Sequence, residues 1–390
     1  MKNFTYLTPT KICFGEGQIS HLKELKKSGT KVLLVYGGGS IRRMGLYDEA
    51  AGILKDEGLT VFELSGVEPN PRIESVRAGA ALCKENGIEM VLAIGGGSVL
   101  DCAKVIAGAA CYDGDAWDLV IHPRRIKASL PIYTVLTMSA TGSEMNGNAV
   151  ITDMNKNEKW GTYSPLFKPV LSILDPTYTY SVPAKQTAAG TADIMSHTFE
   201  NYFTPERGID LQAGFAETIL KTCIKYGPAA LKNPNDYEAR ANLMWASTNA
   251  INGLLSCGAA VSWCVHPMQH ELSAFYDVTH GEGLALLTPH WMEYALAFYP
   301  EETTAKFADY GVNVWGIPWI GDPAEIAKEA IRRTRDFFVN DLHIPGTMRE
   351  LGIPDKRNFA IMAKKAADGC KGSYVPLDAD AILHIYDAAF

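Results

Sequence analysis

Several side chains in the second half of the sequence have the types and spacing of a metal site. Asp193 and His197 lie four residues apart in a stretch with helical periodicity, so both point to the same helix face. His266, His270 and His280 follow later within fifteen residues, and five of the nine histidines of the chain fall between residues 197 and 290. For His197 alone, an ordinary place in the core is the simpler interpretation. The clustering instead favours shared ligation of a metal.

The composition of this set indicates the metal and its use. One carboxylate and three imidazoles without a thiolate suit Fe²⁺ or Zn²⁺, and they leave a coordination position for a substrate oxygen. The site is therefore predicted to be catalytic. A metallopeptidase is a competing use of a histidine-rich site, but the HExxH pattern and its inverse HxxEH are both absent because position 269 is Gln.

Two glycine-rich tracts in the first half have the character of a phosphate-binding site. Residues 37–40 and 95–98 both read Gly-Gly-Gly-Ser, and each tract follows a predicted strand and precedes a helical pattern. Such a turn exposes backbone NH groups at a helix N-terminus, where the helix dipole favours a phosphate. Neither tract is the GxGxxG fingerprint, and one such tract alone is as often only a tight turn. Two tracts at corresponding strand ends predict a dinucleotide lying across the carboxyl ends of a parallel sheet.

A third loop, at residues 137–146, also follows a predicted strand. Its sequence TMSATGSEMN offers hydroxyls and an amide suited to ribose or nicotinamide. Taken alone, a solvated loop without a ligand explains this segment equally well.

The elements that must position these groups form two domains. Short apolar runs first alternate with amphipathic helical patterns, which is the rhythm of βα units in a parallel sheet. Strands are predicted at residues 31–36, 60–64, 90–94, 132–136 and 170–174, with helices at 73–86 and 99–110. Strand signals then end, and helices are predicted at 186–203, 211–226, 237–255, 283–299, 323–339 and 357–367. We expect an α/β dinucleotide-binding domain over residues 1–184 and an all-α metal-binding domain over residues 185–390.

Composition and charge limit the classes of partner. The chain has 390 residues, 47% of them hydrophobic and 21% charged, which is typical of folded proteins with more than one domain. A net charge of −8 with scattered Lys and Arg argues against binding to nucleic acid or an anionic membrane. No secretory signal or membrane span is evident in the sequence. The eight cysteines include no CxxC pair, which is typical of free thiols, so a cytoplasmic protein is expected.

The motifs together resemble those of the iron-containing, group III alcohol dehydrogenases, within them the butanol dehydrogenase and broad aldehyde reductase branch. The resemblance covers essentially the whole chain. The motifs fall in family order: GGGSxxDxAK at 95–104, ATGSE at 140–144, LDPTYTY at 174–180, GTADIMSHTFE at 190–200 and HPMQHELSAFYDVTHGEGLA at 266–285. The resemblance implies the same two-domain architecture, an active-site cleft between the domains and usually a homodimer. It also implies hydride transfer between a nicotinamide cofactor and a small alcohol or aldehyde, such as butanol or butyraldehyde.

The resemblance implies roles for individual residues. The metal ligands would be Asp193, His197, His266 and His280. His270 would lie beside the metal without ligating it, and a proton-relay or orienting role is predicted for it, with plain packing as the alternative. The implied cofactor contacts are Gly38, Gly39, Ser40 and Asn70 near the adenosine ribose, Gly96, Gly97, Ser98 and Asp101 at the pyrophosphate, and Thr137, Thr141, Asn146, Lys159 and Tyr178 toward the nicotinamide.

Two other functions are weaker interpretations. Dehydroquinate-synthase-like lyases share the family's architecture and use NAD and zinc on a phosphorylated sugar acid. Such a site needs a cluster of Lys and Arg, and none borders the histidine motifs. A binding module without catalysis would leave both halves of a redox site without a use.

The preferred cofactor is predicted to be NADP(H) rather than NAD(H). In sites specific for NAD, an acidic side chain at a strand end accepts hydrogen bonds from the ribose 2′-hydroxyl and repels a 2′-phosphate. The predicted strand at 31–36 runs into glycine instead, and Arg42 and Arg43 follow on the next helix, where they are available to a phosphate. Two solvated helix charges are the alternative interpretation of these arginines.

Overall fold

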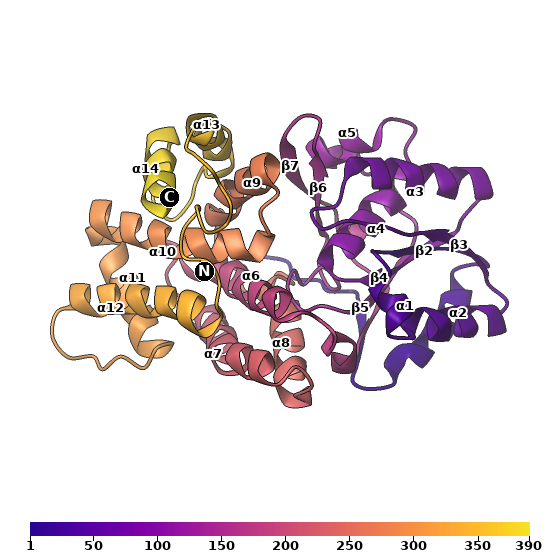
Figure 1. Ribbon diagram of the computed structural model, residues 1–390, viewed down its shortest axis with the longest axis horizontal. Helices are drawn as coiled ribbons and strands as arrows, with labels where there is room; N and C mark the ends of the chain where they lie inside the picture. The colour runs from indigo at the N-terminus through magenta and orange to yellow at the C-terminus, as the bar shows by residue number, and fades with distance from the viewer. The chain divides into compact units, whose positions relative to one another are not determined.

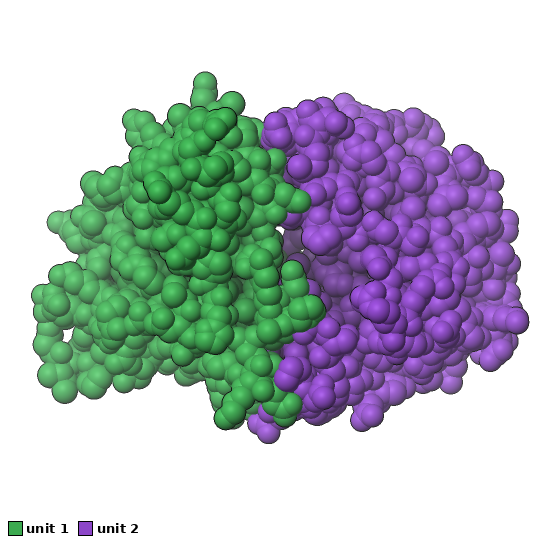
Figure 2. All heavy atoms as spheres, viewed as in Figure 1, with its two compact units in different colours: residues 1–6, 183–233, 249–390 green, residues 7–182, 234–248 purple.

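The computed structural model describes every residue from Met1 to Phe390, and the chain divides into two compact units (Figure 2). Unit 1 comprises residues 1–6, 183–233 and 249–390, and unit 2 comprises residues 7–182 and 234–248. The sequence predicts one boundary, between residues 184 and 185, and the chain passes from unit 2 to unit 1 beside that point. Two short segments lie outside this simple division: residues 1–6 belong to unit 1, and residues 234–248 belong to unit 2. None of the helices has the length and apolar character that crossing a bilayer requires.

Unit 2 is built on a six-stranded sheet in which every neighbouring pair is parallel. The strand order is β1-β8-β5-β4-β2-β3. The strands are β1 (Lys11–Phe14), β2 (Lys31–Tyr36), β3 (Thr60–Leu64), β4 (Met90–Gly95), β5 (Ile132–Leu136) and β8 (Leu171–Leu174). The central strands β4, β5 and β8 are buried along their whole length, as expected for parallel strands covered on both faces. The predicted parallel sheet is therefore confirmed, with β1 as an added edge strand.

Helices cover both faces of this sheet (Figure 1). Leu33 and Val35 of β2 pack in a core with α3 (Ile73–Asn86), α4 (Gly97–Ala109) and α5 (Ala116–Ile121). Val32 and Leu34 face the opposite way and pack with α2 (Leu46–Asp56) and a 3₁₀ segment (Gln18–Lys27). Three further elements belong to this unit: the short α1 (Ser40–Arg43), the antiparallel hairpin of β6 (Asn148–Asp153) and β7 (Glu158–Tyr163), and α8 (Tyr237–Ala250) up to residue 248.

The register of β2 and β4 brings the two glycine tracts together. Tyr36, the last residue of β2, pairs with Ile94 of β4, so the tracts that follow them leave the sheet side by side. Helix α2, after the first tract, packs on one face of the sheet, and α4, after the second, packs on the other. Strand ends whose connections part to opposite faces form the crevice in which open α/β sheets bind their ligands.

Unit 1 is helical (Figure 1). Its helices are α6 (Ala184–Tyr202), α7 (Asp210–Lys232), α9 (Val265–Tyr276), α10 (His280–Phe298), α11 (Pro300–Asn313), α12 (Pro323–Asp336), α13 (Phe359–Gly369) and α14 (Ala379–Ala389). Helix α6 is buried on all sides from Thr187 to Tyr202 and packs against α7 and α10, as a central helix does. The prediction of an all-α second half is confirmed, but α9, α11 and α14 were not among the predicted helices.

Candidate functional site

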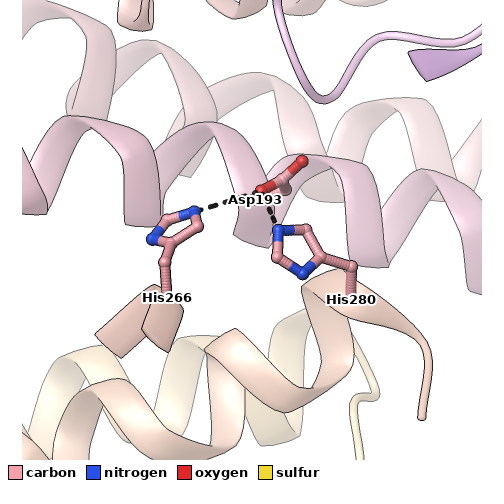
Figure 3. Close-up of side chains that lie close together, drawn as sticks. All are labelled: Asp193, His266 and His280. Carbon is pink, nitrogen blue, oxygen red and sulfur yellow. Dashed lines mark ion pairs between the residues drawn. The ribbon is translucent and has the colours of Figure 1, made fainter. Parts of the chain in front are cut away.

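A carboxylate and two imidazoles converge in unit 1 (Figure 3). Asp193 extends from the middle of α6, His266 from the first turn of α9, and His280 from the first residue of α10. One ligand atom from each lies within 4.8 Å of the others. Asp193 Oδ1 is 3.9 Å from His266 Nε2 and 3.6 Å from His280 Nε2. We call these three residues the Asp-His-His cluster, and its donor set and spacing fit a divalent metal ion.

The other predicted metal ligand, His197, borders this cluster. Its Nε2 lies 3.6 Å from Asp193 Oδ1, and its ring stacks on that of His266 with centroids 4.8 Å apart. Burial lowers the pKa of His197 well below its usual value, so the imidazole is neutral, as a metal ligand must be. Its role as a fourth ligand stays a prediction.

His270 lies beside the same group of histidines. Its ring centroid is 5.6 Å from that of His280 and 6.4 Å from that of His266. Because α9 carries both His266 and His270 one turn apart, the two rings project to the same side of the helix. This is the neighbourhood that a proton-relay or orienting role needs, and that role also stays a prediction.

Glu200 fixes the orientation of His266. Its Oε1 accepts hydrogen bonds from both His266 Nδ1 and the His266 backbone N–H, each at 3.0 Å, and the carboxylate also accepts from the backbone N–H of Cys264. A proton on Nδ1 leaves the lone pair on Nε2, which is buried, has no hydrogen-bond partner and lies toward Asp193. The carboxylate thus prepares His266 for ligation.

Gln269 does the same for His280 through a chain of hydrogen bonds. The Ser273 hydroxyl donates to the carbonyl of Val278 at 2.9 Å and so accepts from Gln269 Nε2 at 2.7 Å. This orients the amide so that Oε1 contacts His280 Nδ1. An amide oxygen can only accept, so the proton of His280 sits on Nδ1 and the Nε2 lone pair is directed to Asp193.

Gly281 allows the start of α10 to approach α6. A Cβ at this position would lie 1.9 Å from the backbone oxygen of Ala189. Only glycine fits such a contact, and the contact carries His280 toward the Asp193 face of α6. Sequence reasoning assigned no role to Glu200, Gln269 or Gly281. Each stands inside a motif that it identified, but no local signal tells which histidine each residue supports.

In unit 2, the turn after β4 has the form that a phosphate site requires. Helix α4 begins at Gly97 with Gly96 as its N-cap, and no side chain caps its first NH groups. A Cβ on Gly97 would lie 2.3 Å from Thr141 Oγ1, so glycine is needed where the loop after β5 packs on the helix start. Gly96 and Ser98 are partly exposed. These backbone NH groups are available to an anion.

The turn after β2 is open as well. Gly39 has a φ of 94°, a left-handed conformation that favours glycine, and it caps α1. Gly38 and Ser40 are exposed. Arg42 on α1 does not point freely into solvent, because it donates hydrogen bonds to Tyr36 Oη at 2.6 Å and Glu63 Oε2 at 2.9 Å.

Two of the predicted cofactor contacts are engaged within the protein. Both oxygens of Asp101 accept hydrogen bonds, one from Ser143 Oγ at 2.6 Å and one from the Val150 backbone N–H at 2.9 Å. Asn146 Oδ1 accepts from Lys104 Nζ at 3.1 Å, and its amide group donates to the Gly142 carbonyl at 2.8 Å. These bonds hold the loop between β5 and β6, so both residues shape the crevice from behind.

Lys104 is fully buried in this network. Burial lowers its pKa to about 8, although the nearby Asp101 and Glu144 carboxyls act in the opposite direction. Burial raises the pKa of Asp101 and of Glu144. The loop is therefore anchored by a lysine whose charge is only partly stabilised.

The remaining predicted contacts lie around this loop. Thr137 begins it, with its backbone N–H bonded to the Gly95 carbonyl at 3.0 Å. Lys159 of β7 donates to Asn70 Oδ1 at 2.9 Å, and Asn70 has a φ of 50°. Tyr178 is half-buried against the sheet core on the α2 side. The Asn70–Lys159 contact joins two residues that the sequence assigned to opposite ends of the cofactor.

Comparison with known proteins agrees with the Asp-His-His cluster of unit 1 and the glycine turns of unit 2. Residues 9–176 match the family model described as iron-containing alcohol dehydrogenase, and residues 187–390 match that described as Fe-containing alcohol dehydrogenase family, C-terminal. Over the full length of both chains, this one is 55% identical to NADH-dependent butanol dehydrogenase A of Clostridium acetobutylicum and 38% identical to NADPH-dependent aldehyde reductase YqhD of Escherichia coli. The crystal structure of NADH-dependent butanol dehydrogenase A from Thermotoga maritima superimposes with a TM-score of 0.93, at 36% identity, over 100% of this chain and 99% of that one.

Proposed function

This chain belongs to the iron-containing alcohol dehydrogenase family and is a metal-dependent oxidoreductase of alcohols and aldehydes, and we propose that its substrates are small molecules such as butanol and butyraldehyde. The observation that carries the proposal is the Asp-His-His cluster in a chain that also has two adjacent glycine tracts at strand ends. The lyase alternative has no support from the relatives, which are named as dehydrogenases and reductases.

We propose that Asp193, His197, His266 and His280 hold Fe²⁺ or Zn²⁺. The bound ion supplies a Lewis acid that polarises the carbonyl oxygen of the substrate. Glu200 and Gln269 keep the protons of His266 and His280 on Nδ1, so that each Nε2 is ready to ligate without a change of tautomer. Neutral imidazoles and one carboxylate leave the centre with a net positive charge once a divalent ion is present, which favours an alkoxide-like oxygen.

His270 is proposed to deliver the proton that the reduced substrate oxygen takes up. The support is its place beside His280, at 5.6 Å between ring centroids, and its partial exposure. In His270→Ala the metal should remain while turnover falls by roughly 10²-fold or more, which is typical of lost acid-base assistance. Loss of the metal in this variant would instead identify His270 as a ligand.

The nicotinamide cofactor is proposed to lie across the ends of β2 and β4. The support is the pair of glycine turns and the uncapped start of α4, which suits a pyrophosphate. Gly38, Gly39 and Ser40 would contact the adenosine ribose, and Gly96, Gly97 and Ser98 the pyrophosphate. Asn70, Thr137, Thr141, Lys159 and Tyr178 stay proposed contacts along the remainder of the cofactor, with Asp101 and Asn146 acting through the loop they anchor.

We propose that this site prefers NADP(H) to NAD(H). Strand β2 ends at Tyr36 and is followed by glycine rather than by an acid, and Arg43 is an exposed cation immediately behind the turn. The names of the relatives include both cofactors, so the comparison leaves either preference open. The test is kcat/KM for NADPH and NADH with butyraldehyde in the wild type and in Gly38→Asp. A wild-type preference for NADH, or no shift toward NADH in the variant, would contradict the proposal.

The metal requirement has its own experiment. Protein stripped of metal with a chelator should not turn over butyraldehyde, and activity should return on anaerobic addition of Fe²⁺ or Zn²⁺. His280→Ala should lose metal and activity together, as measured by elemental analysis and initial rates. Full turnover by metal-free protein would overturn the function proposed for the cluster.

We also propose that the enzyme works as a cytoplasmic homodimer. The resemblance to the family supports the dimer, and eight free cysteines agree with a reducing compartment. Light scattering on the purified protein tests the assembly, and a monomeric mass across the concentrations used for assays would contradict it.

A further inference from the structure

Four side chains form a hydrogen-bonded cluster at the ends of β2 and β3. Glu63 of β3 accepts from Tyr36 Oη at 2.8 Å, from Tyr47 Oη at 2.5 Å and from Arg42 Nη2 at 2.9 Å. Arg42 also donates to Tyr36 Oη, and its guanidinium lies over the Tyr47 ring at 3.6 Å from the centroid. Both hydroxyls, the carboxylate and Nη2 of Arg42 have partners within the cluster, so Arg42 is held in one place by two hydrogen bonds and one aromatic face.

The position of this cluster gives it a connection to the cofactor. Strands β2 and β3 are parallel neighbours (Figure 1). The register pairs Leu34 with Glu63, so Glu63 lies near the end of β3 beside the end of β2. In doubly wound sheets, the strand next to the one that carries the phosphate loop ends at the adenosine ribose, where an acid reads the 2′-hydroxyl. Strand β2 holds that place relative to β4 and has no acid at its end. The acid at this place is Glu63, which comes from the neighbouring strand β3.

Glu63 cancels the charge that Arg42 would offer to a phosphate. Partial burial acts to raise the pKa of Glu63, but the hydrogen bonds from Tyr47 and Tyr36 and the charge of Arg42 hold it below its usual value, so the carboxylate is ionised at neutral pH. A 2′-phosphate bound at this strand end is stabilised by a cation, but the Arg42–Glu63 ion pair has no net charge to offer it. To bind Arg42, the phosphate must compete with a carboxylate that already holds the guanidinium.

We propose that Glu63 is a cofactor-specificity residue that limits the preference for NADP(H) by holding Arg42 in the Tyr36–Tyr47–Glu63 cluster. This inference rests on the proposed nicotinamide site. In the wild type, the 2′-phosphate would then be bound by the backbone of the glycine tract and by Arg43. Arg42 would become available to the phosphate only when its ion pair with Glu63 is removed.

The test is a double-mutant cycle on the metal-loaded full-length protein. Calorimetry gives Kd for NADP⁺ and NAD⁺, and initial rates give kcat/KM for NADPH and NADH, in wild type, Glu63→Gln, Arg42→Gln and the double variant. Glu63→Gln should raise the preference for the phosphorylated cofactor by roughly 10-fold, the size of one charge-assisted contact. Arg42→Gln alone should change it by no more than about twofold, and in the double variant the gain should disappear.

A matched control removes a charge at the opposite edge of the sheet, where the strands begin. Glu89 accepts hydrogen bonds from the backbone N–H groups of Thr30 and Lys31 where β2 begins. Glu89→Gln changes the net charge as Glu63→Gln does, and it should leave the cofactor preference unchanged.

The outcomes separate this inference from the proposed function. An unchanged preference in Glu63→Gln, or a gain that survives in the double variant, would overturn the role of Glu63 while aldehyde turnover stands. Failure of the wild type to reduce any aldehyde would overturn the proposed function, and the two Kd values would still decide the inference.

Discussion

The substitution Glu200→Gln tests whether the hydrogen bond behind His266 tunes the metal centre. Glu200 is buried, and its carboxylate accepts from His266 Nδ1, from the His266 backbone and from the Cys264 backbone. Glutamine keeps the shape but replaces one oxygen with an NH₂ group and removes the charge. The change therefore affects two separate quantities, the stability of the fold and the affinity for metal.

The size of each effect follows from the contacts. Both His266 donors share Oε1, so the amide oxygen should stay on that side and the NH₂ group should face the Cys264 N–H, 3.0 Å from the present Oε2. One compromised buried donor costs about 1–3 kcal/mol of unfolding free energy. The bond to His266 Nδ1 survives without its charge, and weakened support of this kind typically lowers metal affinity by roughly 10–100-fold.

The assay is a competition titration of metal-free protein with Zn²⁺ or Fe²⁺ against a chelator, together with thermal unfolding of the metal-free forms. Glu217→Gln is the matched control, since Glu217 accepts hydrogen bonds from Tyr202 and Asn313 in the same unit and touches none of the histidines. It should lower stability and leave metal affinity as it is. If Glu200→Gln also lowers only stability, the carboxylate merely supports the fold and our account of His266 is wrong.

Three further substitutions probe the close contacts and the buried charge. Gly281→Ala should destabilise the protein by about 1–3 kcal/mol and lower its metal content, because the new Cβ would overlap a backbone oxygen of α6. The control Gly214→Ala, in open space on α7, should stabilise the protein by about 0.5–1 kcal/mol. If the two variants have the same unfolding free energy and the same metal content, the contact at Gly281 does not have this role. Gly97→Ala should raise KM for either cofactor while Gly52→Ala on α2, with nothing near its Cβ, should not; an unchanged KM in both would separate the α4 turn from the cofactor. Burial lowers the pKa of Lys104 to about 8 from an unfolded value of 10.5, so between these pH values the unfolded chain binds more protons and this lysine makes the free energy of unfolding rise with pH. Urea denaturation from pH 7 to 10.5 should show this rise in the wild type and not in Lys104→Met. The same pH dependence of the unfolding free energy in both proteins would refute the prediction.

The sequence alone determined the features that depend on local patterns. The predicted strands β2, β3 and β5 have the bounds that the structure has. Strands β2 and β5 are mostly apolar because nearly all of their residues are buried, whereas the edge strand β3 is partly exposed and includes Glu63. Glycine turns at strand ends and an Asp-His pair one helical turn apart are local patterns of the same kind. They were sufficient for the fold class and for Asp193, while the choice of His266 and His280, with which Asp193 converges, came from the resemblance to the family.

The tertiary structure decided which neighbours each functional group has. His266 is oriented by Glu200 of α6, and His280 is oriented by Gln269, which Ser273 holds in place. Sequence periodicity contains no information about such pairings. The same holds for Asp101, whose carboxylate turns to the loop behind the crevice, and for Arg42, which is held by an acid from the next strand. A side chain's type sets the bonds it can make, but distance and burial select among them, and these are fixed only when elements remote in sequence pack together.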